Sequence, residues 1–356
     1  MTQIHIILLI ATIILIFMFA TCSTSTDEDA ILKYLEDENE HNLPIMWIHI
    51  PFEYNARFWS SFGSRSSTNV NQPYIELTLR SIIKNCDNSF KIMLIDDGSF
   101  KQLIPNWKIE LNKLSDPVLP YVRQLGIAQL IYRYGGMVVP PSFLCFKDLI
   151  TLYEKGTSNN SMFVGENVNK SVGSEISEFS PDIHLMGANK NSPMLKDYIE
   201  FIRRVISRDY TAQPVFKGEF NAWVNERIGA NQIGMIPGTL LGTQTSDGEP
   251  VLVDNLLSEN TISFYDDMYG IWIPMNEILS RRHYEWFARL DAEQIFDSNC
   301  ILCKYFVLAL APSERDGLQT QKPNWVSFWK TPRASVWGLK PILLGNNIPR
   351  EDAPYF

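Results

Sequence analysis

The sequence lacks several features that would assign it directly to a common functional class. It contains no phosphate-binding P-loop, no G-x-S-x-G nucleophile motif, no metalloprotease motif and no internal repeat. It also lacks an excess of basic residues, because 31 Lys and Arg stand against 40 Asp and Glu, a formal charge of −9. A general nucleic-acid binder shows a basic face, so this charge argues against nucleic acid as a partner.

What the chain does have is length and the composition of a folded protein. Its 356 residues allow one elaborated α/β domain or two domains. Hydrophobic residues make up 45% and charged residues 20%, which are ordinary values for a protein with a packed core. The nine Trp, 14 Tyr and 20 Phe serve core packing first, and stacking against sugar rings is a second use of such side chains.

The amino terminus is an almost entirely apolar segment, residues 4–22. As a helix it would span roughly 28 Å, enough for a thin bilayer. A cleaved signal peptide is the alternative, with Ala20-x-Cys22 as its small-residue cleavage site. The segment has no basic residues before it and is longer than a signal-peptide core, so we predict an uncleaved anchor. An acidic stalk, residues 23–43, follows.

A single amino-terminal anchor ahead of a large folded part has a consequence for location. We predict a single-pass membrane protein whose carboxyl-terminal domain is luminal or extracellular, in an ER- or Golgi-type membrane or a virion membrane. The lipid bilayer is then a partner through residues 4–22. The sequons at Asn159 and Asn169 agree with such exposure, although sequons also arise often by chance.

Beyond the stalk, apolar runs alternate with an amphipathic segment. The runs at 44–51 and 90–99 predict buried strands, because they are short, continuous and bounded by residues that break strands. The segment 73–86 between them places its apolar residues on one helical face, and Pro73 fits the first turn of a helix. These residues therefore predict a strand, a helix and a second strand.

Residues 118–146 extend this order and organise the rest of the chain. Apolar residues recur at helical spacing up to residue 134, and Gly135 and Gly136 end that helix. Residues 137–139 predict a buried strand that ends at Pro140. Alternation of strand and helix predicts an α/β fold with a mixed, mostly parallel sheet flanked by helices. Ligands of such sheets bind at the carboxyl ends of the strands.

The same stretch resembles a known family. Residues 132–139, Tyr-Arg-Tyr-Gly-Gly-Met-Val-Val, are similar to the Leu-Tyr-x-Tyr-Gly-Gly-Ile-Tyr core of the DXD-containing sugar transferases, which include initiating mannosyltransferases and capsular polysaccharide proteins. The resemblance covers about residues 44–210 and implies a GT-A, nucleotide-sugar-binding fold. The surroundings of the motif also resemble glycosyltransferase-like proteins encoded by large DNA viruses.

The chain departs from the family at the positions that hold the metal. In the family, the strand after Gly-Gly ends in Asp-x-Asp, whose carboxylates hold a divalent metal against the donor diphosphate. Here Pro140, Pro141 and Ser142 stand at those positions. Mn²⁺ or Mg²⁺ would lack its carboxylate ligands, so we predict no metal and no other cofactor.

Two charged positions of the family helix before Gly-Gly are also replaced. The family's Asp and Arg fall on Gln124 and Ile127, counted back from Gly135. Arg123 lies one position away from Gln124, and its use in place of the family residues would require an insertion. The packing residues of this stretch are therefore retained while its charged functional residues are neutral.

The resemblance implies a set of donor-binding candidates at strand ends and turns: His49, Asp96, Asp97, Gly135, Gly136 and Ser142. An alternative reading accompanies several of them. His49 is also consistent with a packed core histidine, and Asp96 and Asp97 with caps of the next helix. No residue is assigned as catalytic.

Acceptor-side candidates come from a later part of the resemblance. Asp182 and His184 precede a helix that is predicted to start with Ser192 as N-cap and Pro193 in the first position. A loop aspartate and a packed histidine are the alternatives. Farther along, Cys300-Ile-Leu-Cys303 is a lone C-x-x-C, for which burial or a local disulfide is favoured over zinc.

Three functions remain open from the sequence. The first is a membrane-anchored glycosyltransferase that moves a sugar from a nucleotide sugar to a glycan or glycoprotein. In this case, basic side chains such as Arg133, Arg281 or Arg282 would replace the charge of the metal, or Asp96 and Asp97 would rebuild the site from a neighbouring strand end. The second is a catalytically degenerate relative that binds glycans or serves assembly or a virion surface. The third is an unrelated membrane-tethered α/β protein. The glycosyltransferase-like domain would span 44–356, with a nucleotide-sugar half at about 44–210 and a carboxyl-terminal elaboration at about 211–356.

Overall fold

The computed structural model describes residues 43–50, 72–114, 118–158, 161–170, 177–208, 213–310 and 342–344. These residues belong to one compact unit, Leu43–Asn347. The predicted anchor, residues 4–22, the stalk up to residue 42, and Asn159 lie outside the described residues. Within the described ranges, no helix combines the length and the apolarity needed to cross a bilayer.

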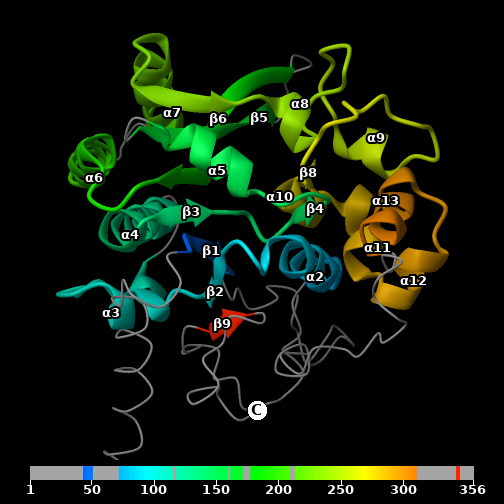
Figure 1. Cartoon of the computed structure of the whole chain (residues 1–356), viewed down its shortest axis with the longest axis horizontal. Coiled ribbons are helices and arrows are strands. Elements are labelled where there is room, and N and C mark those ends of the chain that lie inside the picture. The colour runs from blue at the N-terminus through cyan, green and yellow to red at the C-terminus, as the bar shows by residue number, and fades with distance from the viewer. Residues whose placement is uncertain are drawn as a thin grey trace, which may run out of the picture. The chain divides into compact units, whose positions relative to one another are not determined.

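The unit is built on a mixed α/β sheet with the strand order β7-β5-β6-β3-β1-β2-β9 (Figure 1). Its strands are β1 (Ile45–His49), β2 (Lys91–Ile95), β3 (Gly136–Val138), β5 (Met162–Lys170), β6 (Ser177–Ala188), β7 (Ile233–Ile236) and β9 (Ile342–Leu344). Strand β1 pairs in parallel with β2 and β3, and β5 pairs in parallel with β7. Strand β6 is antiparallel to β3 and β5, and β9 is antiparallel to β2. Strands β6 and β9 thus run against the other five strands, which all point in one direction, and the predicted mixed, mostly parallel sheet is confirmed.

Helices cover both faces of this sheet. In Figure 1, helices α3 (Ser99–Leu103), α4 (Val118–Tyr134), α6 (Pro193–Ile206) and α7 (Gln213–Gly229) lie on the left of the sheet. On the right are α2 (Tyr74–Cys86), a small sheet of β4 (Phe143–Cys145) and β8 (Gly270–Trp272), and the carboxyl-terminal helices. The predicted helices at 73–86, 118–134 and after Ser192 are confirmed.

The remaining elements are short helices, of which the first two lie in the first half of the chain and the others in the carboxyl-terminal part. They are η1 (Leu111–Lys113), α5 (Ile150–Gly156), α8 (Gly238–Leu241), α9 (Val253–Leu257), α10 (Met275–Ser280), η3 (Arg282–Tyr284), α11 (Glu285–Arg289), α12 (Ala292–Asp297) and α13 (Ile301–Leu310). Helices α9 to α13 supply apolar side chains to the same core as β1, β2 and α2. The residues after 211 thus share the core of the preceding half.

The two-residue period of β1 decides which side chains meet which layer. Met46 and Ile48 point into the core on the α2 side. Trp47 and His49 point to the opposite side, where the Trp47 ring lies 5.9 Å from Tyr134 of α4 and the His49 ring lies 5.4 Å from Phe100 of α3. The His49 side chain at the end of β1 therefore faces α3 and α4, not the main core.

Gly135 and Gly136 connect α4 to β3 in a conformation that favours glycine. Their φ angles are 79° and 97°, in the left-handed region that side chains disfavour. A Cβ on Gly136 would lie 2.0 Å from the carbonyl oxygen of Ile45 in β1. Trp47 donates a hydrogen bond from Nε1 to the Gly135 carbonyl over 3.0 Å. The Gly-Gly pair is thus what lets β3 lie beside β1.

Replacement of Gly136 by Ala is expected to destabilise the protein strongly. The new Cβ would add a backbone clash to an unfavourable φ, so we expect the free energy of unfolding to fall by more than about 2 kcal/mol. The matched control is Gly229→Ala at the end of α7, where a Cβ would meet nothing within 4 Å. Urea denaturation of both variants measures the difference, and equal midpoints for Gly136→Ala and the wild-type protein would contradict this account.

Candidate functional site

The sheet has a topological switch point at the carboxyl end of β1. The chain leaves β1 for β2 on one side and then returns to β3 on the other side, and both neighbours are parallel to β1. In open α/β sheets, ligands bind outside the carboxyl ends of the strands at such a point. His49 is the last residue of β1 and marks this position.

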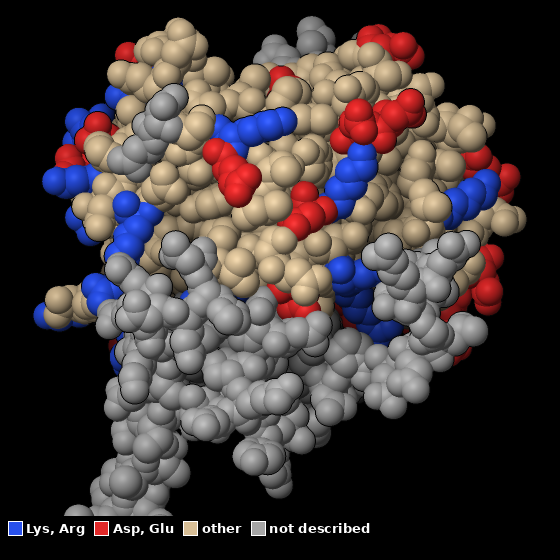
Figure 2. Space-filling model, in the orientation of Figure 1, with Lys and Arg blue, Asp and Glu red and all other residues tan. Residues whose placement is uncertain are grey.

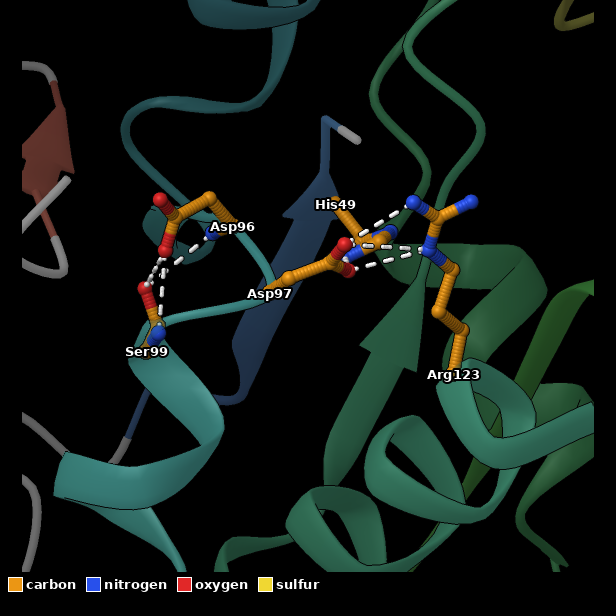
Figure 3. A network of polar contacts seen from close by, with 5 residues as sticks. All are labelled: His49, Asp96, Asp97, Ser99 and Arg123. Atoms are coloured by element: carbon orange, nitrogen blue, oxygen red, sulfur yellow. Dashed lines mark hydrogen bonds and ion pairs between the residues drawn. The ribbon is translucent and has the colours of Figure 1, made fainter. Parts of the chain in front are cut away.

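His49, Asp97 and Arg123 form a polar cluster at the switch point (Figure 3). Asp97 follows β2 and Arg123 lies in the first part of α4. The Arg123 guanidinium holds the carboxylate in a bidentate pair, with Nε 3.0 Å from Oδ1 and Nη2 2.8 Å from Oδ2. His49 Nε2 lies 3.0 Å from Oδ1. Because an ionised carboxylate only accepts hydrogen bonds, His49 donates from Nε2 in this contact.

The surroundings keep Asp97 ionised. Burial alone would raise the pKa of Asp97, but hydrogen bonds and charge from His49 and Arg123 outweigh it and lower this pKa to about 2. The side chains of His49, Asp97 and Arg123 are 12%, 18% and 15% exposed. One guanidinium charge thus faces one carboxylate charge, and the pair adds no net positive charge to the site.

Asp96 takes a separate role from Asp97. It is buried, and its Oδ1 accepts hydrogen bonds from the Ser99 backbone N–H over 2.9 Å and from the Ser99 hydroxyl over 2.8 Å, where α3 begins (Figure 3). The two carboxylates point away from each other and bond to different partners (Figure 3). Among the described residues, no three His, Cys, Asp or Glu side chains gather in a group that would hold a metal ion.

The strand end that would hold the metal in the sugar transferases is closed. Pro140, Pro141 and Ser142 are all buried. Thr78 of α2 donates its hydroxyl hydrogen to the Pro141 carbonyl over 2.5 Å, and the Ser142 hydroxyl donates to the Ile273 carbonyl over 2.7 Å. A hard divalent cation prefers carboxylate oxygens, which these residues do not offer. The residues present therefore do not fit the metal that the resemblance implies.

A second polar group lies on β5 and β6. His184 Nδ1 lies 2.6 Å from Asp182 Oδ1, and Asn167 donates from Nδ2 to Asp182 Oδ2 over 2.9 Å. The charge of Asp182 raises the pKa of His184. Burial alone would raise the pKa of Asp182, but the charge and hydrogen bonds of His184 lower it. The His184 side chain is 59% exposed, so Asp182 orients an imidazole that solvent and ligands can reach.

The strand register brings both histidines to the same edge of the sheet. Trp47 of β1 pairs with Val138 of β3, which pairs with Met186 of β6. His49 lies two residues after Trp47, and His184 lies two residues before Met186 on the antiparallel strand. Both therefore lie toward the end of the sheet at which β1 and β3 finish.

Strand β6 is irregular where it carries Asp182 and His184. Val164 of β5 pairs with Met186, but the next residue, Gly165, pairs with Asp182. The pKa of Tyr198 of α6 is raised mainly by burial and further by the charge of Asp182, so Asp182 lies near α6. Helix α6 packs on α4, the helix that carries Arg123.

Other predicted site residues have structural explanations. Gly135 and Gly136 are explained by the approach of β3 to β1, and Ser142 by its hydrogen bond to Ile273. Asn169 lies near the end of β5. Cys300 and Cys303 form a disulfide at the start of α13, as the local-disulfide interpretation predicted. Of the basic side chains considered as metal substitutes, Arg281 pairs with Glu277 over 3.1 Å and Arg133 lies 5.4 Å from the ring of Tyr134.

The residue that the sequence did not assign is Arg123. The charged positions of the family helix fall on Gln124 and Ile127, and the use of Arg123 in their place would require an insertion. The signal that would have found it is Asp97, an acid at a strand end, which needs a cation from the helix packed over that end. Arg123 is the only cationic side chain in the first half of α4, Val118–Gly126 by sequence.

The described surface adds two observations away from this edge. On the face shown in Figure 2, basic and acidic side chains are interspersed and leave no broad basic patch. A shallow cavity of about 580 Å³ lies at the opposite edge of the sheet, with Ser161, Pro193 and Gly234 among its lining residues. It is near the amino ends of β5 and β7, away from the switch point.

Acid should remove the contribution of Asp97 to stability. The folded pKa of about 2 lies below the unfolded value near 3.9, so the contribution is complete above about pH 4 and is lost as the pH falls toward 2. Asp97→Asn is expected to lower the free energy of unfolding by about 2 kcal/mol at pH 7 and by much less at pH 2. Urea denaturation at both pH values measures this. The control Asp267→Asn, whose side chain is 77% exposed, should show little change at either pH.

Comparison with known proteins adds no assignment. No protein-family model matches the chain, and no curated protein matches it. Evidence on function therefore comes from the two polar groups at the carboxyl edge of the sheet and from the closed strand end between them.

Proposed function

We propose that the protein is a GT-A-like relative of the sugar transferases that has lost metal-dependent sugar transfer and binds a carbohydrate-containing ligand at the carboxyl edge of its sheet. One observation carries the proposal. The strand end after Gly-Gly, where the resembled family holds its metal, consists of the buried residues Pro140, Pro141 and Ser142, whose polar groups bond to the protein's own core.

The charge balance at the switch point supports the loss of metal-dependent transfer. A nucleotide-sugar diphosphate concentrates negative charge, which the metal normally neutralises while it also stabilises the leaving group. Arg123 would be the substitute cation nearest to His49, but its charge is matched by Asp97 in a bidentate pair. Release of Arg123 for a ligand would leave Asp97 buried without its main cationic partner, which is costly.

The polar groups at this edge suit a ligand rich in hydroxyl groups. Sugar hydroxyls both donate and accept, so they are bound by carboxylates, amides and imidazoles. Asp182, His184 and Asn167 offer these three groups in one hydrogen-bonded cluster, and His49 lies toward the same end of the sheet. Such neutral or paired groups can recognise a glycan without an excess of charge.

A metal-independent glycosyltransferase is the second candidate, and one observation favours it. His184 is exposed and is oriented by a carboxylate that raises its pKa, which is the arrangement of a general base with its orienting group. In this candidate, His184 would take the proton of an acceptor hydroxyl as the sugar is transferred. It would still need a cation for the diphosphate, which the Arg123–Asp97 pair does not readily supply.

A titration with nucleotide sugars distinguishes the candidates. Purified full-length protein is mixed with UDP-, GDP- and CMP-sugars, with and without Mn²⁺, and its melting temperature and the released nucleotide are measured. We expect no release of nucleotide and no effect of Mn²⁺. On a panel of immobilised glycans, we expect binding that His184→Ala reduces at least tenfold and that Arg204→Ala, an exposed substitution on α6, leaves unchanged.

Other results of these experiments would favour the second candidate or contradict one or both candidates. Release of nucleotide that requires Mn²⁺ would contradict the loss of metal-dependent transfer. Release without metal that His184→Ala abolishes would favour the second candidate. A ligand present at 100 times its dissociation constant adds about 2.7 kcal/mol of stability, so absence of any thermal shift and of any glycan binding would contradict both candidates.

We also propose that residues 4–22 anchor this domain to a membrane, since the segment is almost entirely apolar and long enough for a thin bilayer. The protein expressed in eukaryotic cells should then stay with the membrane pellet after extraction at high pH, and deletion of residues 1–22 should release it. Recovery of the full-length protein in the soluble fraction, or an amino terminus cut near Cys22, would contradict an uncleaved anchor.

A further inference from the structure

A row of polar side chains on helix α2 forms hydrogen bonds to the segment that follows β3. Thr78 donates to the Pro141 carbonyl over 2.5 Å, Ser81 Oγ accepts from the Cys145 backbone N–H over 2.9 Å, and Asn85 donates to the Cys145 carbonyl over 3.0 Å. Positions 78, 81 and 85 share one face of a helix. Three hydrogen bonds thus hold the backbone of residues 141–145 against α2.

A pair of cysteines continues this row. Cys86 is the last residue of α2 and Cys145 is the last residue of β4. Both side chains are completely buried, and their sulfur atoms are 3.9 Å apart. A disulfide requires about 2.05 Å, so an approach of about 1.9 Å would join them, a distance that side-chain rotation and a small backbone shift can cover.

We propose that Cys86 and Cys145 form a disulfide bond that locks α2 to the strand end after Gly-Gly. Two observations support it beyond the distance. The hydrogen bonds of Ser81 and Asn85 already fix the backbone at Cys145, so little additional order is lost when the bond forms. The same core also contains the Cys300–Cys303 disulfide, which is expected of a protein that folds in an oxidising compartment.

The bond forms by two exchange reactions with an external disulfide, either glutathione disulfide or an oxidoreductase disulfide. One cysteine thiolate attacks the external disulfide and releases one thiolate, and the second cysteine thiolate then attacks the mixed disulfide and releases the other. The two cysteines lose two protons and two electrons, and the external disulfide is reduced to two thiols. Burial raises the pKa of the Cys145 thiol in the folded protein, so the exchange belongs to folding, before the core closes.

The loop that this bond closes contains the switch-point cluster. Cys86 and Cys145 are 59 positions apart, and the chain between them includes β2, α4, β3 and the residues Asp97 and Arg123. A cross-link over such a loop restricts the unfolded chain and therefore stabilises the fold. It would also hold Pro140–Ser142 in the closed arrangement that excludes the family's metal.

Peptide mapping tests the disulfide directly. The full chain is expressed through a eukaryotic secretory pathway, denatured in iodoacetamide without reductant, and digested with trypsin. Cys86 then lies in peptide 85–91, Cys145 in peptide 134–147, and Cys300 with Cys303 in peptide 290–304. We expect peptides 85–91 and 134–147 as one cross-linked species that a reductant separates. Alkylated Cys86 and Cys145 in separate peptides would overturn the proposal, whatever the state of Cys300 and Cys303.

Substitution gives a second readout that distinguishes a bond from simple packing. Cys86→Ser should leave Cys145 open to alkylation after denaturation, and Cys145→Ser should do the same for Cys86. Each single variant should lower the melting temperature by about 5 °C or more, and the double variant should lower it little further, because the first change already breaks the bond. Losses that add up in the double variant would point to packing alone and would contradict the disulfide.

Discussion

The close packing of β3 against β1 is the constraint on which the rest of the structure depends. Strand β1 pairs in parallel with a neighbour on each edge, and four of its five residues are buried. Gly136 is required at the contact, because any side chain there would meet the Ile45 carbonyl. This contact creates the switch point and fixes His49, around which Asp97 and Arg123 gather.

The same packing buries the strand end after Gly-Gly. This strand end lies between α2 and the loop after β8, and its polar groups bond inward to both. Pro140, Pro141 and Ser142 carry no charge, so they can be buried without an ionic partner. The polar side chains of α2 then hold the segment in place.

The two histidines toward this edge have different surroundings. His49 is nearly buried, stacks on Phe100 and bonds to a carboxylate that also holds Arg123. His184 has a carboxylate partner too, but its side chain is mostly exposed. The ring of His49 is therefore held by its neighbours on β1, α3 and α4, whereas the ring of His184 can be reached from solvent.

The sequence by itself determined the local elements, because hydrophobic period, Gly-Gly and Pro act within a few residues. It predicted the strand and helix order of the first half and the local disulfide at Cys300. It treated Asp96 and Asp97 as one pair of carboxylates, whereas the structure gives them separate partners. Only the tertiary structure decided that Arg123 is the partner of Asp97, that Asp182 and His184 share the edge of His49, and that Cys86 meets Cys145. Each of these pairs depends on how a helix rotates against the sheet or how strands align, and packing across distant segments sets both.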